Sequence, residues 1–72
     1  MTVSTQRDLL IEKLIEKLHD RDARIRRNAA GALGLHGARA LEATAELSAL
    51  LADDDPSVRA TVERTLDHLR FA

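Results

Sequence analysis

"LIEKLHDRDARIRRNAAGALG" occupies residues 14–34 and "LSALLADDDPSVRATVERTLD" occupies residues 47–67, so the second stretch repeats the first at an offset of 33. Six of the 21 aligned positions are identical, and they include the aspartates and the arginine at the middle of each stretch. A period of this length is typical of arrays in which each repeat is one helical unit that packs on its neighbour. The sequence therefore predicts two copies of one supersecondary structure.

Apolar residues recur at intervals of three and four in both copies, and nothing alternates with period two. This pattern predicts helices and no strand. We expect an all-α fold, an α-α superhelix of four helices in two hairpins, within a single domain of residues 1–72. The expected repeats cover about 5–34 and 38–70. The four helices are expected at about 5–19, 23–33, 38–52 and 56–69.

The expected core is aliphatic, because hydrophobic residues reach 44% of the chain while aromatic residues reach only 1%. The third helix is apolar on two sides, so we expect it to be sandwiched between neighbours. The second helix is expected to bury Ile25, Ala29, Ala32 and Leu33. The third is expected to use Leu47, Leu50 and Leu51 on one side and Leu41, Ala45 and Ala52 on the other. The fourth is expected to bury Val58, Val62, Leu66 and Leu69.

The run "DDDPSVRATV" (53–62) has the composition of a helix start. Asp55 can accept hydrogen bonds from unpaired N–H groups as the N-cap, and Pro56 fits the first helical position, where no N–H is needed. Asp22 is expected to cap the second helix in the same way. Ser4 or Thr5 is a candidate N-cap for the first helix, and Gly34 a candidate left-handed C-cap for the second.

An arginine in the first turn and a half of a helix opposes the helix dipole and therefore needs a carboxylate partner. Arg26 and Arg59 hold this position in the two copies, and Asp20 and Asp53 are the natural partners. We expect these four side chains to stabilise the turns.

A leucine-rich helix end, then D-x-D-(P)-x-[VI]-R, then "AAGALG", resembles the HEAT repeat, and in particular its short version in phycobilisome lyases. The resemblance implies an armadillo-like α-solenoid in which second helices line a concave surface that binds protein partners. It also implies a ladder of Asp and Arg side chains, here Asp20, Arg26, Asp53 and Arg59.

The second copy departs from this pattern where small residues would admit another repeat. Val62, Glu63 and Asp67 replace Ala29, Ala30 and Gly34, and the first helix carries Asp8, Glu12, Glu16 and Lys17 where the third is apolar. Polar outer faces are typical of terminal repeats. We therefore expect a complete two-repeat unit.

Polar side chains off the core stripe of the second helices are candidates for recognition, and arginines among them suit a carboxylate-rich peptide. The candidate groove residues are Arg24, Arg27, Asn28, Thr61 and Arg64. A homodimer is a second expectation, because two repeats alone bury little surface. Its candidate residues are Leu9, Leu35 and Phe71, although Phe71 is more readily placed as an end cap that folds back.

Catalysis is not expected, because the histidines at 19, 36 and 68 share no spacing and no phosphate loop or nucleophile motif occurs. The deoxyhypusine hydroxylases, which are related by resemblance, place a His-Glu iron pair where this chain has Arg27 and Asn28, or Ala60 and Thr61. We expect no metal or other cofactor. There is no Cys, no long apolar run and no secretion signal, so the cytoplasm is the expected location and a membrane is not an expected partner.

The expected function is a non-enzymatic protein interaction module, an adaptor or regulator of a larger assembly. An accessory role in phycobilin attachment or phycobiliprotein turnover is an alternative that rests only on the repeat subtype. Nucleic-acid binding through "RDARIRR" (21–27) is another, but a net charge of -1 gives no long-range attraction.

Overall fold

The computed structural model describes residues 8–71 of the chain. Within this range it contains two helical hairpins and no strand, so the expected all-α fold is confirmed. The elements are α1 (Leu9–Lys17), α2 (Ala23–Leu35), the 3-10 helix η1 (Gly37–Ala43), α3 (Thr44–Ala49), the 3-10 helix η2 (Leu50–Ala52) and α4 (Pro56–Leu69). We call η1, α3 and η2 together the composite third helix.

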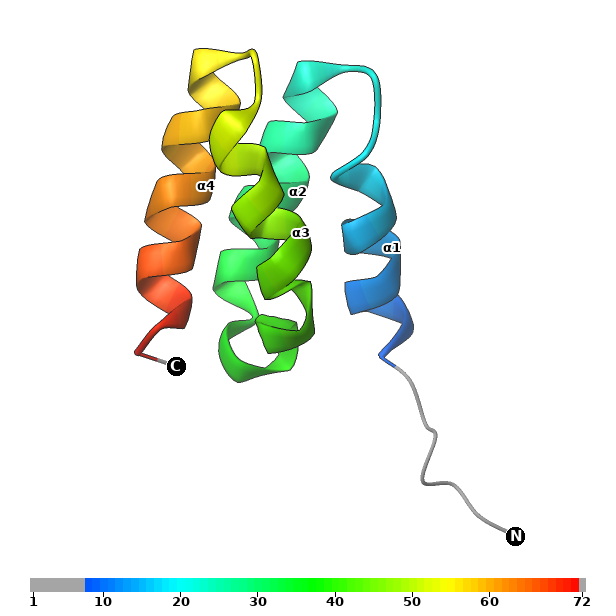
Figure 1. Ribbon diagram of the computed structural model, residues 1–72. Helices are drawn as coiled ribbons and strands as arrows, with labels where there is room; N and C mark the ends of the chain where they lie inside the picture. The colour runs from blue at the N-terminus through cyan, green and yellow to red at the C-terminus, as the bar shows by residue number, and fades with distance from the viewer. Residues whose placement is uncertain (1–7, 72) are drawn as a thin grey trace, which may run out of the picture.

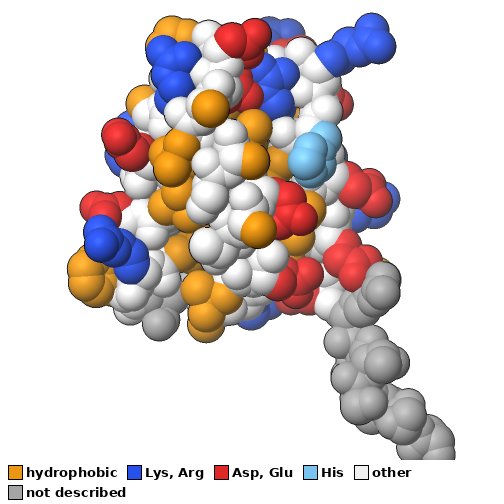
Figure 2. Space-filling view, in the orientation of Figure 1, with side chains coloured by type: hydrophobic (Ala, Val, Ile, Leu, Met, Phe, Trp, Pro, Cys, Tyr) orange, Lys and Arg blue, Asp and Glu red, His pale blue; other side chains and the backbone are white. Residues whose placement is uncertain are grey.

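The two hairpins stand side by side, with both turns at the same end of the molecule (Figure 1). In each hairpin the first helix runs toward the turn and the second runs back, so α2 and α4 are parallel neighbours (Figure 1). Their contact is the most extensive one between any two elements. Charged side chains of both signs gather at the turn end (Figure 2).

Helix α1 begins later than its apolar pattern predicts. Asp8 has extended backbone angles and its side chain accepts a hydrogen bond from the N–H of Ile11, so Asp8 is the N-cap. It also accepts a hydrogen bond from Arg39 Nε at 2.8 Å, which ties the start of α1 to η1. The predicted start near residue 5 is therefore wrong, and the caps proposed at Ser4 and Thr5 lie outside the described residues.

The left-handed turn after α2 lies at Gly37, whose φ is +55°, and not at Gly34. Gly34 is a buried residue within α2, and the helix ends at Leu35 with His36 as its C-cap. The prediction of a C-cap at Gly34 is wrong, because this glycine lies where two helices pack closely. A glycine near the end of an apolar stripe fits either role, so the sequence pattern does not distinguish them.

The third helix is neither regular nor sandwiched. It begins as a 3-10 helix without a side-chain N-cap and becomes α-helical only at Thr44. Leu47 is fully buried, but Leu41 and Leu51 are 48% and 44% exposed. The second apolar side expected from the sequence is not buried, because Leu41, Ala45 and Ala52 are all exposed. Leu51 is exposed as well, although the sequence predicts it on the same side as Leu47.

Helix α4 spans the predicted residues, with Asp55 as N-cap and Pro56 as its first residue. Val58, Val62 and Leu69 are buried as expected, while Leu66 is only partly buried. A buried position that the pattern missed is Thr65, which donates a hydrogen bond of 3.0 Å to the carbonyl of Ala30. The threonine is tolerated in the core because this bond satisfies its hydroxyl group.

The core is aliphatic and lies between the two hairpins. On α2, Ile25 is 37% exposed where the pattern predicts burial, and Ala30 is fully buried instead. The buried apolar residues are Ile11, Leu18, Ala29, Ala30, Leu33, Ala40, Ala43, Leu47, Val58, Val62 and Leu69. Alanines form a large part of this set, and their small side chains allow the helices to approach closely.

Candidate functional site

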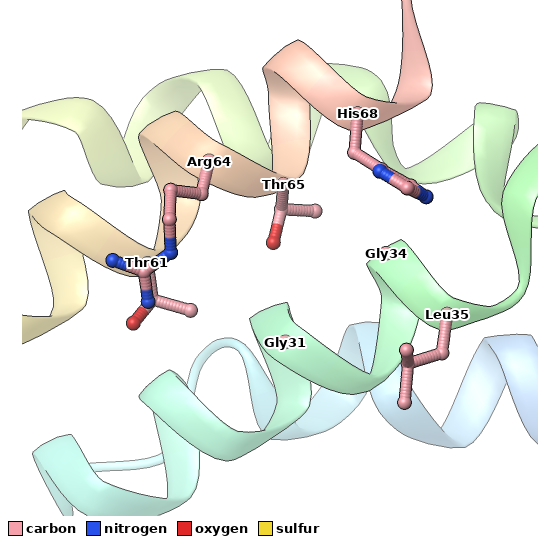
Figure 3. A pocket seen from close by; sticks show the side chains of 7 residues that line it. All are labelled: Gly31, Gly34, Leu35, Thr61, Arg64, Thr65 and His68. Carbon is pink, nitrogen blue, oxygen red and sulfur yellow. The ribbon is translucent and has the colours of Figure 1, made fainter. Parts of the chain in front are cut away.

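A hollow of about 300 Å³ opens on the surface where α2 and α4 run side by side (Figure 3). We call this hollow the α2/α4 groove. Both helices contribute side chains to it, and the two glycines lie on α2 (Figure 3). The lining residues are Gly31, Gly34, Leu35, Thr61, Arg64, Thr65 and His68.

The groove exists because α2 has no side chains along part of the contact with α4. A Cβ atom at Gly34 would lie 3.4 Å from both Cγ2 and Oγ1 of Thr65, at the short limit of ordinary van der Waals contact. A Cβ atom at Gly31 would lie 3.8 Å from Cγ2 of Thr61, at an ordinary distance. Gly34 therefore leaves little room for a side chain between the helices, whereas Gly31 keeps the floor of the groove open.

The rim of the groove combines polar and apolar groups, and Arg64 supplies a positive charge. Arg64 and His68 are exposed on α4, and Leu35 is 86% exposed at the end of α2. A guanidinium group recognises carboxylates through paired hydrogen bonds. The groove can therefore accept a short segment that presents a small apolar side chain to the glycines and an acidic side chain to Arg64.

Two of the five predicted groove residues, Thr61 and Arg64, line this hollow, and the other three do not. Arg24 is exposed near the start of α2 and pairs with Asp22, Nη2 to Oδ2 at 3.3 Å. Arg27 and Asn28 also lie closer to the turn end than the glycines do. The sequence analysis missed the glycines, although the small residues of "AAGALG" were the available signal.

The turn end of the molecule is held by an ion pair between the hairpins. Arg26 donates from Nε to Asp53 Oδ2 at 2.8 Å and from Nη2 to Asp53 Oδ1 at 3.0 Å. Its Nη1 donates to the carbonyl of Asp20 at 2.8 Å. The guanidinium of Arg26 holds the pKa of Asp53 below its ordinary value. This pair joins the second helix of one repeat to the turn of the next.

The other turn aspartates act on the backbone. Asp20 Oδ1 accepts from the N–H of Asp22, and Asp22 in turn caps α2 through the N–H of Arg24. Asp55 caps α4 through the N–H groups of Ser57 and Val58. Each turn thus places one carboxylate inside the turn and one at the helix start.

Arg59 repeats one half of the contact made by Arg26. Its Nη1 donates to the carbonyl of Asp53 at 2.6 Å, as Arg26 Nη1 does to Asp20. No carboxylate lies against Arg59 within residues 8–71. The expected pairing of both arginines with turn carboxylates is therefore present for Arg26 alone.

The three candidates for self-association are all strongly exposed. Leu9, Leu35 and Phe71 are 69%, 86% and 83% exposed. Phe71 does not fold back as an end cap, and the guanidinium carbon of Arg70 lies 5.9 Å from its ring centre. All three belong to helix ends that lie away from the turns (Figure 1).

The described part of the chain also lacks two features that would indicate other functions, a metal-binding cluster and a membrane-spanning helix. Among residues 8–71 no group of three or more His, Cys, Asp or Glu side chains is placed to hold a metal ion. Within the same range, every helix is too short or too polar to cross a bilayer.

Two stacked helical hairpins with parallel second helices define a short α-solenoid. A family model of HEAT repeats matches residues 11–70, and the chain therefore belongs to the HEAT repeat family. The match spans both hairpins. Proteins of this family generally mediate contacts between proteins and are typically non-catalytic scaffolds. Searches of curated proteins and of solved structures each returned no match.

Proposed function

We propose that this protein is a non-enzymatic interaction module, an adaptor or regulator that binds a segment of another protein in the α2/α4 groove. The observation that carries the proposal is the open glycine floor between α2 and α4, next to the exposed Arg64. A helix pair that only needed to pack would gain stability from alanine at Gly31, where a Cβ meets no close contact.

The partner segment is proposed to be acidic and to carry small apolar side chains. The guanidinium group of Arg64 at the rim favours carboxylates, and the hollow of about 300 Å³ admits only a few side chains. Arg27 and Asn28, further toward the turn end of α2, are proposed to extend the contact along the same helix. Thr61 supplies a hydroxyl group within the groove.

Nucleic-acid binding is less well supported, because much of the arginine cluster is engaged in the protein itself. Arg26 is bound to Asp53, and Arg24 is paired with Asp22. The short repeat subtype of phycobilisome lyases, with its link to phycobilin attachment, rests on the motif and on the period of 33 residues. We keep it as a proposal about the type of repeat.

The proposed function is tested by affinity capture from the native host with three baits. The wild-type chain and Lys13→Glu, a charge reversal at an exposed site on α1, should capture the same partner. Arg64→Glu should lose it, because the carboxylate introduced at the rim repels an acidic segment. The helical circular-dichroism signal and the melting temperature of both variants should match the wild type.

If Arg64→Glu retains the partner at wild-type strength, the α2/α4 groove is not the binding site. Fluorescence anisotropy with single-stranded and duplex DNA addresses the alternative. Binding that weakens steeply with added salt would favour nucleic acid over protein as the partner.

A further inference from the structure

The ion pair between the two hairpins joins two side chains, and the repeat places a counterpart of each one, unpaired among residues 8–71, on an outer side of the molecule. One half of the pair is an arginine in the second helix, and the other half is the first aspartate of the following turn. Arg26 and Asp53 meet within the chain. The offset of 33 residues makes Arg59 the counterpart of Arg26, and Asp20 the counterpart of Asp53.

Both unmatched halves are already held in the required arrangement. Arg59 Nη1 is fixed on the carbonyl of Asp53 as Arg26 Nη1 is on that of Asp20, and no described residue binds the Nε edge of Arg59. Asp20 Oδ1 accepts a hydrogen bond of 2.8 Å from the N–H of Asp22. Asp53 Oδ1 accepts the equivalent bond, of 2.9 Å, from the N–H of Asp55. Within residues 8–71 no arginine side chain binds the Asp20 carboxylate.

Equivalent leucines show which side of each hairpin lacks a neighbour. Leu18 of the first repeat is 1% exposed, whereas its counterpart Leu51 is 44% exposed. Leu51 lies with Leu66 in a hollow of about 380 Å³ on the outer side of the second repeat. The outer side of the second repeat therefore presents apolar groups that its counterpart in the first repeat buries.

The opposite pattern holds on the outer side of the first repeat. Val58 of the second repeat is fully buried, whereas its counterpart Ile25 is 37% exposed. Ala43 is fully buried, whereas its counterpart Leu10 is 48% exposed. The chain thus carries two different open faces, one with Arg59 and Leu51 and the other with Asp20 and Ile25.

The two outer faces are also partly complementary in the size of their side chains. Inside the molecule Gly34 lies against Thr65. Their counterparts on the two outer faces are Asp67 and Ala32, so a larger residue on one face would meet a smaller one on the other. Glu63, the counterpart of the fully buried Ala30, introduces a second carboxylate. An outer contact should therefore be weaker than the internal one, because these carboxylates lose water on burial.

We propose that a second copy of this chain docks on the Arg59 face through its own Asp20 face, so that Arg59 of one copy binds Asp20 of the next. A second copy is the occupant because the same chain carries both missing halves. The contact is head to tail and uses two different surfaces, so it does not close on itself and further copies can add. The proposal rests on Arg59 and Asp20, which do not line the α2/α4 groove, and it goes beyond the proposed function.

Arg21 supplies a test that should strengthen the contact. It is the counterpart of Asp54, whose Oδ1 lies 3.8 Å from Arg26 Nη2 within the chain. In a head-to-tail pair, Arg21 of one copy would therefore approach Arg59 of the other and repel it. Arg21→Asp replaces this repulsion with attraction and should lower the dissociation constant several-fold.

Sedimentation velocity at low ionic strength, from micromolar to millimolar concentration, tests the proposal. The average mass of the wild type should rise steadily with concentration. Arg59→Ala and Asp20→Asn should each weaken association by about tenfold or more. Asn at position 20 keeps an oxygen for the Asp22 N–H, and matching circular-dichroism melts would show that both variants fold.

A mixing experiment separates this contact from a symmetric one. Arg59→Ala retains the Asp20 face and Asp20→Asn retains the Arg59 face, so an equimolar mixture should form a one-to-one dimer that neither variant forms alone. Arg21→Asp should tighten association of the wild type and have no effect in the Arg59→Ala background. A wild type that stays monomeric throughout would overturn the proposal. The proposal would also be overturned if Arg59→Ala or Asp20→Asn associated as strongly as the wild type, or if the equimolar mixture of the two stayed monomeric.

Discussion

The guanidinium group of Arg26 on α2 binds both carboxylate oxygens of Asp53, which lies 27 residues further along the chain at the start of the second turn. The side chains of this pair are only 14% and 5% exposed. The pair therefore fixes the turn end of one hairpin against the other.

Arg26→Ala should destabilise the fold more than any other arginine substitution among the described residues. It removes both bonds to Asp53 and two bonds to backbone carbonyls at residues 20 and 21. For a domain of this size we expect the melting temperature to fall by about 5 to 15 °C. Arg24→Ala is the matched control, because its pair with Asp22 is exposed, and it should change the melting temperature very little.

A double-mutant cycle with Asp53→Ala isolates the pair itself. The combined variant should be much less destabilised than the sum of the two single variants, since the pair can be lost only once. Additive changes in the free energy of unfolding would show that Arg26 acts through the backbone carbonyls alone.

Stability should fall on acidification below about pH 4. Hydrogen bonds from Arg26 lower the pKa of Asp53, and those from Ser57 lower the pKa of Asp55, relative to the ordinary value of 3.8. A carboxyl group whose pKa is lowered in the folded state stabilises the protein at pH values above its pKa in the unfolded state. This stabilisation is lost as the pH falls through the pKa of the group in the folded state. Urea melts between pH 7 and 2 should show this slope.

The variant Asp53→Asn should be less stable than the wild type at pH 7 and should lose less stability on acidification. Its amide cannot titrate, so one of the groups that bind protons on unfolding is absent. A slope equal to that of the wild type would place the acid sensitivity at other carboxyl groups.

The two glycines of the groove should respond in opposite ways to alanine. Gly31→Ala adds a Cβ at an ordinary distance from Thr61 and should gain up to about 1 kcal/mol from helix propensity. Gly34→Ala adds the same propensity, but its Cβ lies 3.4 Å from two atoms of Thr65. We expect no net gain at Gly34, and Gly34→Val should be clearly destabilised. Equal gains at both sites in thermal melts would contradict the close approach at Gly34.

The sequence predicted the elements that local chemistry and the repeat define. Helix α4 is correct at both ends because Asp55 and Pro56 mark its start and Leu69 ends its apolar stripe. The roles of residues that depend on a neighbouring helix could not be predicted in the same way. The sequence pattern predicts a helix end at Gly34, because the contact of this glycine with Thr65 comes from another repeat.

The candidate site was predicted only in part for the same reason. The sequence pattern does not distinguish between off-stripe positions along a helix, yet the groove opens only beside the glycines, so it includes Arg64 and not Arg27. An amphipathic pattern gives the direction of a side chain around its helix. It does not give the depth of the surface between two helices, which depends on the side chains of both.

The composite third helix provides the last prediction, because its two apolar sides are not equivalent. Leu47 is fully buried, so Leu47→Ala should destabilise the protein by about 2 to 5 kcal/mol through lost contacts and a cavity. Leu41 is 48% exposed on the same segment, and Leu41→Ala is the control with the identical chemical change. It should lower the free energy of unfolding by less than about 1 kcal/mol, since much of its side chain already contacts water. Urea denaturation of both variants measures the difference. Similar losses at the two leucines would mean that the outer side of this helix is covered in solution, as the sandwiched arrangement expected from the sequence requires.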